Sequence, residues 1–450
     1  MKQRLATIVT SLALVGTIAA ATPNVVAAQG WLAPDSLNAY VASTGSSYGA
    51  DGSSCSRPNI SVATNFPGDA ALAIQEAVDL IMPRGTIHLC AGTYRIDSVI
   101  YLRGKILTIE GAGQSRTTLL GGATSGMIET RGAATFRDLT ITEGHGESAL
   151  SAYPSYGCGR QIDVNLNWQV VPEIYSTYCP RASTADLNLG VTEAGGHELL
   201  VVRTNRSSTD LLKSVQNGVL DESIFKASDI YADEECTGGC SEMQIPVSLP
   251  VGHYVFFCNI ASGHYESMHT DFEVVAAPTL TVDRSTFTDN SSNNGGAISA
   301  LYSSITNSTF HSNSAVFGGG AIRANYLTIR DSTFSGNAAA YGGAIVAWSS
   351  LDMTGSTFTS NVASGSQATW GGNGGAIVIE TWLGTDLRLI RRNTFTENIA
   401  SGPGGAIVLW TGCGPAVTRA EAARVVGMNR FSKNRGASRT PDIARVDYCD

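Results

Sequence analysis

The residue types best suited to metal chemistry gather in the middle of the chain. The segment HYVFFC ends in Cys258, and the loop NIASGHYESMH that follows carries His264 and Met268 before the strand-like TDFEVV. Upstream, GGHELLVVRTN places His197 at the start of another apolar strand. One thiolate, two imidazoles and one thioether form the ligand set of a mononuclear copper site with a trigonal plane and a weak axial Met. We therefore predict that His197, Cys258, His264 and Met268 bind one copper ion.

The cysteine count also sets Cys258 apart. Nine cysteines in an exported chain are expected to form disulfides, and an odd number leaves one over. Sequence order suggests Cys55–Cys90, Cys158–Cys179, Cys236–Cys240 and Cys413–Cys449, although order alone does not fix connectivity. This pairing leaves Cys258 as a free thiol, and metal ligation would explain it.

Missing motifs narrow the predicted copper chemistry. The loop after Cys258 has no second cysteine for a binuclear centre, and no His-x-His pair for a trinuclear cluster occurs anywhere in the chain. One-electron transfer at a single copper is the chemistry that remains. We expect an electron carrier rather than a catalyst and assign no catalytic residue.

A repeat fills the last third of the chain. Phe-x-x-Asn recurs 23 to 24 residues apart in its first four copies, and later copies are spread by insertions: Phe287/Asn290, Phe310/Asn313, Phe334/Asn337, Phe358/Asn361, Phe395/Asn398 and Phe431/Asn434. Gly-Gly-Ala-Ile lies between the copies and begins at Gly295, Gly319, Gly342, Gly374 and Gly404. Short alternating segments such as LTVDRSTF precede each Phe-x-x-Asn and are typical of strands.

This repeat length predicts one coil of a parallel β-helix. Each Phe should stack inside the solenoid, and each Asn should lie at a bend and bond to the next Asn. The paired glycines should supply positive φ in the following turn.

One interruption breaks the repeat. FRDLTITEG (136–144) and LTVDRSTFTDN (280–290) look like successive coils, yet about 130 residues lie where other coils have a short glycine-rich turn. A bend tolerates such an insertion if the two ends of the insert lie close together. We predict an all-β protein: a right-handed parallel β-helix (29–150 and 277–450) with an inserted Greek-key β-sandwich (151–276).

The termini and the charge predict location and partners. Lys2 and Arg4, the apolar run from Leu5 to Ala21 and a small-residue site before Gln29 indicate a signal peptide at 1–28. We expect a secreted, non-transmembrane protein that is periplasmic, extracellular or at the cell surface. Residues 151–276 hold 16 of the 38 acidic residues but 6 of the 29 basic ones. This excess of negative charge argues against nucleic acid and favours a basic redox protein as partner.

Three family resemblances accompany these patterns. Phe-x-x-Asn with Gly-Gly-Ala-Ile resembles the polymorphic outer-membrane protein repeat, and AIQEAVDLIMPRGTIHLCAGTYRI resembles the helix and first strand of pectate-lyase-like β-helices. HELLVVRTN and YVFFCNIASGHYESMHTDFEV resemble the ligand strands of cupredoxins, the plastocyanin- and azurin-like proteins. The cupredoxin resemblance implies the same four ligands. The five residues between Cys258 and His264 are on the long side for that family, which leaves His269 as the alternative imidazole.

Two other functions remain open. The first is a carbohydrate-active β-helix enzyme with an accessory copper domain, although the acidic residues of the repeats are scattered in sequence. The second is a surface adhesin, binding the cell surface or carbohydrate through the β-helix, in which copper is structural or stored.

Overall fold

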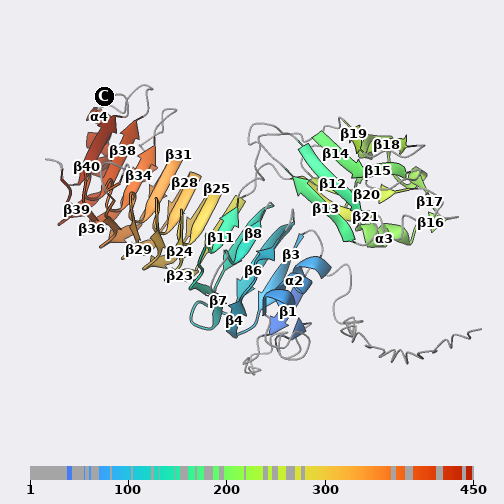
Figure 1. Ribbon diagram of the computed structural model, residues 1–450, viewed down its shortest axis with the longest axis horizontal. Coiled ribbons are helices and arrows are strands. Elements are labelled where there is room, and N and C mark those ends of the chain that lie inside the picture. The colour runs from blue at the N-terminus through green and yellow to red at the C-terminus, as the bar shows by residue number, and fades with distance from the viewer. Residues whose placement is uncertain are drawn as a thin grey trace, which may run out of the picture.

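A computed structural model describes most of the repeats and the strands of the insert. The residues that it describes are 38–42, 55, 60–61, 70–81, 84–102, 105–122, 126–130, 132–146, 148–152, 161–167, 170–176, 186–191, 197–216, 219–236, 242–245, 252–259, 269–274, 279–365, 371–380, 389–411, 419–437 and 442–447. Figure 1 shows a long stack of strands with a separate group of strands, the insert, beside it. Among these residues, no helix is long and apolar enough to span a membrane.

The stack consists of parallel coils, which confirms the predicted β-helix scaffold; its right-handed sense stays a prediction. The main row of paired strands is β1 (Asn38–Ala42), β3 (Arg84–Leu89), β6 (Ile106–Gly111), β9 (Ala134–Arg137), β22 (Thr279–Asp283), β25 (Ile298–Thr306), β28 (Ile322–Arg330), β31 (Ile345–Thr354), β34 (Ile377–Glu380), β38 (Ile407–Thr411) and β40 (Ile443–Asp447). The same sheet also contains β2 (Ile60–Ser61), which pairs with β1, and four strands beside the main row: β5 (Ile100–Tyr101), β8 (Ile128–Thr130), β11 (Leu150–Ala152) and β35 (Ile390–Arg391).

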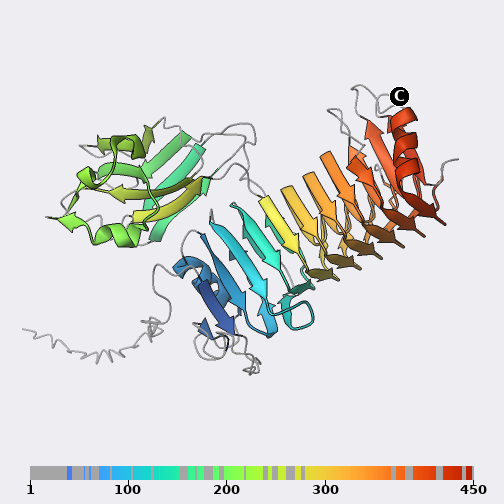
Figure 2. The same cartoon turned by 180° about the vertical axis from the view of Figure 1, so that it is seen from behind.

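Two further rows complete the coils. The longer is β4 (Gly92–Ile96), β7 (Thr117–Gly121), β10 (Thr140–Thr142), β23 (Thr286–Thr288), β26 (Thr309–His311), β29 (Thr333–Ser335), β32 (Thr357–Thr359), β36 (Thr394–Thr396) and β39 (Arg430–Ser432). The shorter is β24 (Ser291–Ser292), β27 (Ser314–Ala315), β30 (Ala338–Ala339), β33 (Val362–Ala363) and β37 (Ile399–Ala400). Figure 2 shows short strands in regular steps along the lower edge of the stack.

The repeated phenylalanines form one continuous column inside the coils. From Phe287 to Phe395 each ring is fully buried. Neighbouring ring centroids lie 4.7 to 5.0 Å apart, with interplanar angles of 2° to 12°, and Phe431 ends the column. Because each ring from Phe287 to Phe395 occupies the middle position of a three-residue Thr-Phe-x strand, strand pairing and ring stacking set the same register. The predicted Phe stack is therefore confirmed.

The repeated asparagines form a second buried column, as predicted. The side-chain Nδ2 of Asn313 donates to Oδ1 of Asn337 at 3.0 Å and to the Phe287 carbonyl of the preceding coil at 3.0 Å. Oδ1 of Asn337 also accepts the backbone N–H of Asn313 at 3.0 Å. The same contacts recur along the series from Asn290 to Asn434. Each amide thereby satisfies backbone groups that the bend would otherwise bury unpaired.

The first glycine of each Gly-Gly-Ala-Ile turn has positive φ, from +58° to +69°. A Cβ on Gly295 would lie 2.1 Å from the Ile298 carbonyl oxygen, so no larger residue fits there. The residue before each ladder Asn is also left-handed, for example Asp289 at φ 56° and Ser360 at φ 55°. Apart from Gly336, these residues are not glycines, so their left-handed conformation has a cost that the Asn contacts must offset.

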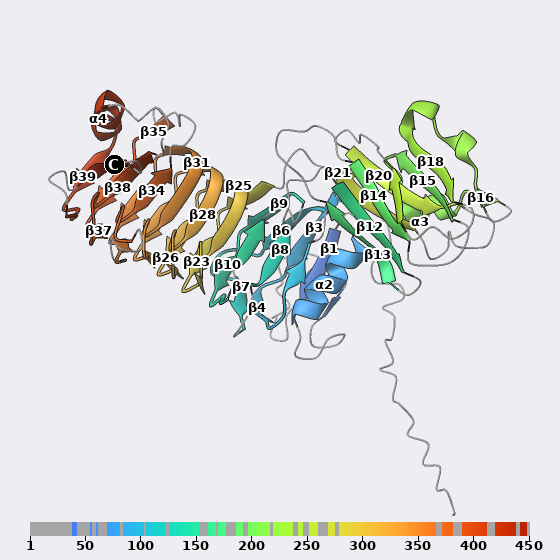
Figure 3. The ribbon, with the colours of Figure 1, turned by 45° about the horizontal axis from the view of Figure 1, so that its top comes forward.

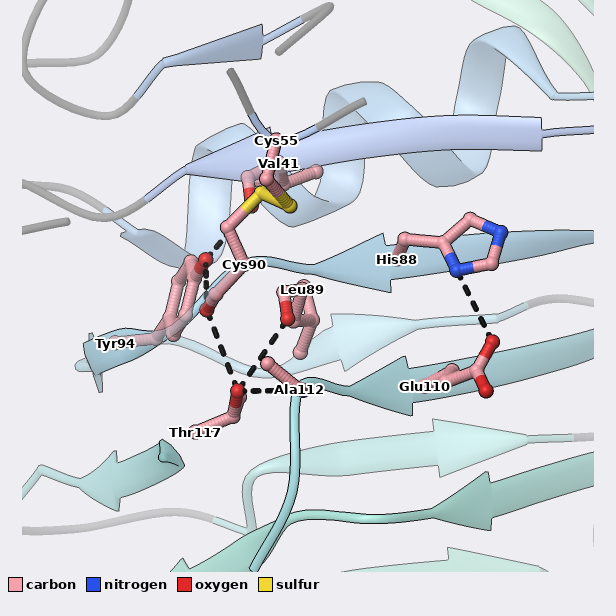
Figure 4. Close-up of a disulfide and its surroundings, with 9 residues drawn as sticks. All are labelled: Val41, Cys55, His88, Leu89, Cys90, Tyr94, Glu110, Ala112 and Thr117. Atoms are coloured by element: carbon pink, nitrogen blue, oxygen red, sulfur yellow. Dashed lines mark hydrogen bonds and ion pairs between the residues drawn. A yellow bond between two sulfur atoms is a disulfide. The ribbon is translucent and has the colours of Figure 1, made fainter. Parts of the chain in front are cut away.

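Both ends of the described stack are covered by helices. At the N-terminal end, α2 (Ala70–Leu80) buries Ile74 and Val78 against the first coils. Nearby, Cys55 and Cys90 form a disulfide, which confirms one predicted pair (Figure 4). At the other end, α4 (Arg419–Met428) buries Val425 in the same core. The other predicted disulfides involve residues or side chains outside those described.

The chain leaves the stack after β11 and returns to it at β22, and these two strands lie beside consecutive parts of the same strand, β25. Leu150 to Ala152 of β11 pair with Ile298 to Ala300, and Thr279 of β22 pairs with Tyr302. In β25 only Leu301 separates the residues that pair with β11 from those that pair with β22. The insert therefore takes the place of one residue. Its two ends should lie about 7 Å apart, the length of two residues of a strand. This place differs from the predicted glycine-rich turn. Leu301 and Tyr302 are both partly exposed at a break in the buried alternation, so an insertion there interrupts no core side chain.

The insert contains two four-stranded sheets (Figure 3). One has the order β13 (Val170–Ser176), β12 (Gln161–Asn167), β14 (Asp186–Val191) and β19 (Glu242–Ile245). The other has the order β18 (Ile230–Cys236), β15 (His197–Arg203), β20 (Gly252–Cys258) and β21 (His269–Val274). A short hairpin, β16 (Val215–Gln216) and β17 (Val219–Leu220), and α3 (Ser208–Leu212) complete it.

The sheet of β15 and β20 is buried on both faces. On one face, Leu200, Val202, Val255 and Phe257 pack with Leu211 of α3 and Leu220 of β17. On the other face, Val201, Tyr254 and Phe256 are also fully buried. The insert therefore has a core of its own, separate from the column of the β-helix.

The Asn column can be tested by removing one rung. Asn337→Ala deletes a fully buried amide and leaves Asn313 and the Phe310 carbonyl with unmade hydrogen bonds. We expect a loss of roughly 2–4 kcal/mol in the free energy of unfolding, measured as a lower urea midpoint. Asn325→Ala, a half-buried Asn of the same coil, is the control; an equal loss in both variants would contradict a structural role for the ladder.

The insertion point can be tested by excision. Replacing 153–278 with one leucine should join β11 and β22 into a strand like β25, because the register leaves room for a single residue. The shortened chain should keep its β circular dichroism and unfold cooperatively. A second deletion, 153–283, also removes β22 and should lose stability. Failure of the first variant to fold would show that the insert is integral to the solenoid.

Candidate functional site

The predicted ligands His197 and Cys258 are brought to the same end of one sheet. His197 begins β15 and Cys258 ends β20, and these strands are antiparallel neighbours with Leu199 opposite Cys258. His197 lies two residues before Leu199, and side chains alternate along a strand. Positions 197 and 258 therefore belong to the same face of the sheet. The side chains of both residues, and the whole of His264 and Met268, lie outside the described residues.

The alternative imidazole, His269, belongs to the opposite face. The register pairs His269 of β21 with Phe257 of β20, one residue before Cys258. The two rings are stacked with centroids 5.7 Å apart and an interplanar angle of 27°. Since Phe257 and Cys258 alternate in facing direction, His269 lies on the α3 side of the sheet. This register favours His264 over His269 as the second imidazole.

A disulfide between Cys258 and Cys236 is incompatible with the strand order. Cys236 ends β18 and is paired with His197, whereas Cys258 lies on β20 at the other side of β15. Neighbouring strands are about 4.8 Å apart, so these Cα atoms are about 9 Å apart or more, beyond the ~7 Å limit for a disulfide. Within this sheet, positions 236 and 258 are therefore too far apart for their cysteines to pair.

A buried tyrosine shares the face of positions 197 and 258. Tyr254 is fully buried, and its ring meets that of Tyr231 edge-on at 5.3 Å. Burial, and then the neighbouring Tyr231, raise the pKa of the Tyr254 hydroxyl well above its usual value. Tyr254 is therefore a neutral phenol at ordinary pH and contributes packing rather than charge.

Sequence analysis missed a polar cluster on the outer face of the first coils. Strand register aligns Tyr40, His88, Glu110 and Arg137 on four successive strands. His88 Nδ1 lies 3.0 Å from Glu110 Oε2, as Figure 4 shows, and Arg137 Nε lies 3.1 Å from Glu110 Oε1. Tyr40 stacks on the imidazole with centroids 4.5 Å apart. The cluster thus holds an imidazole oriented by a carboxylate, an arrangement that suits acid–base chemistry.

The environment of His88 favours its neutral form. Burial lowers the pKa of His88, Glu110 acts in the opposite direction, and Arg137 lowers it further. His88 Nε2 is also within 3.2 Å of Asn38 Oδ1. The sequence did contain a signal, because the similar triplets TIH, TIE and TFR lie at or next to the ends of successive strands. Their alignment, however, depends on coil lengths that vary in this part of the chain.

Among the described residues, no group of three or more His, Cys, Asp or Glu side chains is placed to hold a metal ion. The predicted copper ligands are not tested by this result, because their side chains are outside those ranges.

The His88 cluster predicts a pH-dependent stability. An unfolded His titrates near pH 6.5, and the folded pKa is lower, so folded protein resists protonation that the unfolded chain accepts. The stabilisation is complete above pH 6.5 and is lost as pH falls from there toward the folded pKa. His88→Gln should flatten this part of the urea midpoint–pH curve. Glu110→Gln, which removes the partner that raises the pKa, should extend the loss to lower pH; an unchanged curve in both variants would contradict the assignment.

Comparisons with known proteins bear on the scaffold. Residues 284–301 match the Chlamydia polymorphic membrane protein repeat, the stretch that includes Phe287, Asn290 and Gly295. No curated protein matches the chain. A solved structure of a mannuronic acid-specific polysaccharide family 6 lyase from human gut microbiota is 12% identical and covers 81% of this chain and 86% of its own, with a TM-score of 0.19. That score is too low to support an inference.

Proposed function

We propose that the protein is an exported β-helix scaffold whose inserted domain binds one copper ion and transfers single electrons. The ligands of this proposal are His197, Cys258, His264 and Met268. The observation that carries it is the register of β15 and β20, which puts positions 197 and 258 on one face at one end of a sheet. The loop from β20 to β21, which carries His264 and Met268, begins at that same end.

The chemistry of the four residues fits copper. Soft sulfur ligands suit Cu(I) and imidazoles also hold Cu(II), so bound copper would supply a one-electron couple. The chain's contribution is a rigid frame: both faces of the sheet are buried, so β15 and β20 hold their ligands with little freedom to rearrange. A fixed frame lowers the structural change that accompanies each electron.

The charge of the insert favours a basic partner. Residues 151–276 carry 16 acidic and 6 basic residues, and Asp221, which directly follows β17, is exposed. An acidic surface attracts a basic redox protein over a distance set by ionic strength. The rate of electron exchange with such a partner should therefore fall as salt is added.

The proposed site predicts a visible signature. The full-length chain loaded with Cu(II) should show an intense blue thiolate-to-copper absorption. Cys258→Ser should abolish that absorption, and His264→Ala should abolish or strongly shift it. His269→Ala, matched in residue type but on the opposite face, should leave it intact. Loss of colour in His269→Ala with retention in His264→Ala would assign the imidazole to His269, and a colourless wild type with Cys258 oxidised would refute the proposal.

The comparisons support the scaffold part of the proposal rather than the copper part. The matched repeat is named for a membrane protein, which fits a β-helix displayed at a cell surface, whether as carrier of the copper domain or as an adhesin. In an adhesin, copper would be structural or stored, and it would not cycle reversibly between its two redox states.

A second candidate function is a carbohydrate-active enzyme on the β-helix. The observation that favours it is the oriented His88–Glu110 pair beside Arg137, because an imidazole and a cation on one surface suit acid–base cleavage of an acidic polysaccharide. Release of new reducing or unsaturated ends, lost in His88→Gln and kept in Cys258→Ser, would support this candidate. Equal release by wild type and His88→Gln would exclude the cluster as the site.

A further inference from the structure

Asn259, the residue that follows Cys258, has a buried side chain that makes three hydrogen bonds in the described part of the insert. Its side chain is 3% exposed. Oδ1 accepts the backbone N–H of Leu220 at 2.6 Å, and Nδ2 donates to the Leu220 carbonyl at 3.3 Å. Nδ2 also donates to Glu222 Oε1 at 3.0 Å. The amide therefore pairs with both backbone groups of one residue, as a neighbouring strand would.

These contacts clamp the start of the proposed ligand loop. Leu220 ends β17, 39 residues before Asn259 in the chain, and belongs to the core on the α3 side of the sheet. Asn259 is fixed on that side, whereas position 258 belongs to the other face. Because successive residues of a strand alternate in direction, anchoring residue 259 on one face also fixes the backbone of residue 258.

We infer that Asn259 is a positioning residue for the Cys258 thiolate and that it acts through its two hydrogen bonds to Leu220. This inference rests on the proposed copper function. A thiolate ligand must be held in place for a copper site to keep its geometry in both redox states. Groups that orient a metal ligand without touching the metal typically change affinity 10- to 100-fold when removed. Asn259 meets this description, since its amide contacts the backbone of β17 and the Glu222 carboxylate.

The test compares two variants of the full-length protein. Asn259→Ala removes the clamp. Ser207→Ala removes the Oγ cap that accepts the backbone N–H of Asp210 at 3.0 Å in α3, and so destabilises the same domain while leaving the contacts of Asn259 with Leu220 and Glu222 in place. We expect Asn259→Ala to bind copper about 10- to 100-fold more weakly and to shift the thiolate-to-copper absorption. Ser207→Ala should lower the urea midpoint yet leave the position of that absorption unchanged.

A measurement without copper accompanies the optical one. In the apo protein, Asn259→Ala should speed hydrogen exchange at the Leu220 amide, because that N–H loses its acceptor. A wild type that takes up no copper overturns the proposed function and, with it, this inference. A coloured wild type whose absorption and affinity respond equally to Asn259→Ala and Ser207→Ala overturns this inference alone.

Discussion

The buried column of asparagine amides is the interaction on which the β-helix depends. Each amide accepts from the preceding coil and donates to the carbonyl of one neighbour and the amide of another, so none can be displaced alone. A shift of one residue would move a phenylalanine out of its column and leave an amide buried without partners, which costs about 1–3 kcal/mol per group. This cost fixes the register of every coil. It also allows non-glycine residues such as Asp289 to keep the left-handed conformation at the bend.

Fixed coils explain how a whole domain can interrupt the solenoid. In a repeat structure each coil contacts only its neighbours, so what happens at one bend does not affect distant packing. The insert takes the place of Leu301 of the next coil, where the alternation of buried side chains is broken and two consecutive side chains are partly exposed. Its ends are close together, and its strands pack into a core of their own. The proposed copper site therefore depends on the register of β15 and β20, not on the β-helix.

Sequence alone was sufficient where the pattern was periodic. The Phe and Asn columns follow from one repeated spacing, and the Cys55–Cys90 pair follows from order. Features that depend on alignment between unlike segments were not predictable. The insertion point is defined by the pairing of β11 and β22 with consecutive parts of β25. The His88–Glu110–Arg137 cluster arises from coils of unequal length. The choice between His264 and His269 depends on the pairing of β20 with β21, because one residue of register decides the face. No spacing in the sequence fixes that register.

A crystal structure of the copper-loaded protein, with anomalous scattering measured on both sides of the copper absorption edge, tests the proposed site most directly. The register predicts one strong copper peak at the end of β15 and β20, on the face opposite Phe257 and His269. The peak should be bonded to the Cys258 sulfur and to the imidazoles of His197 and His264, with Met268 more distant. A peak beside His88 and Glu110, a peak on the His269 face, or Cys258 joined to another cysteine would contradict the proposed centre.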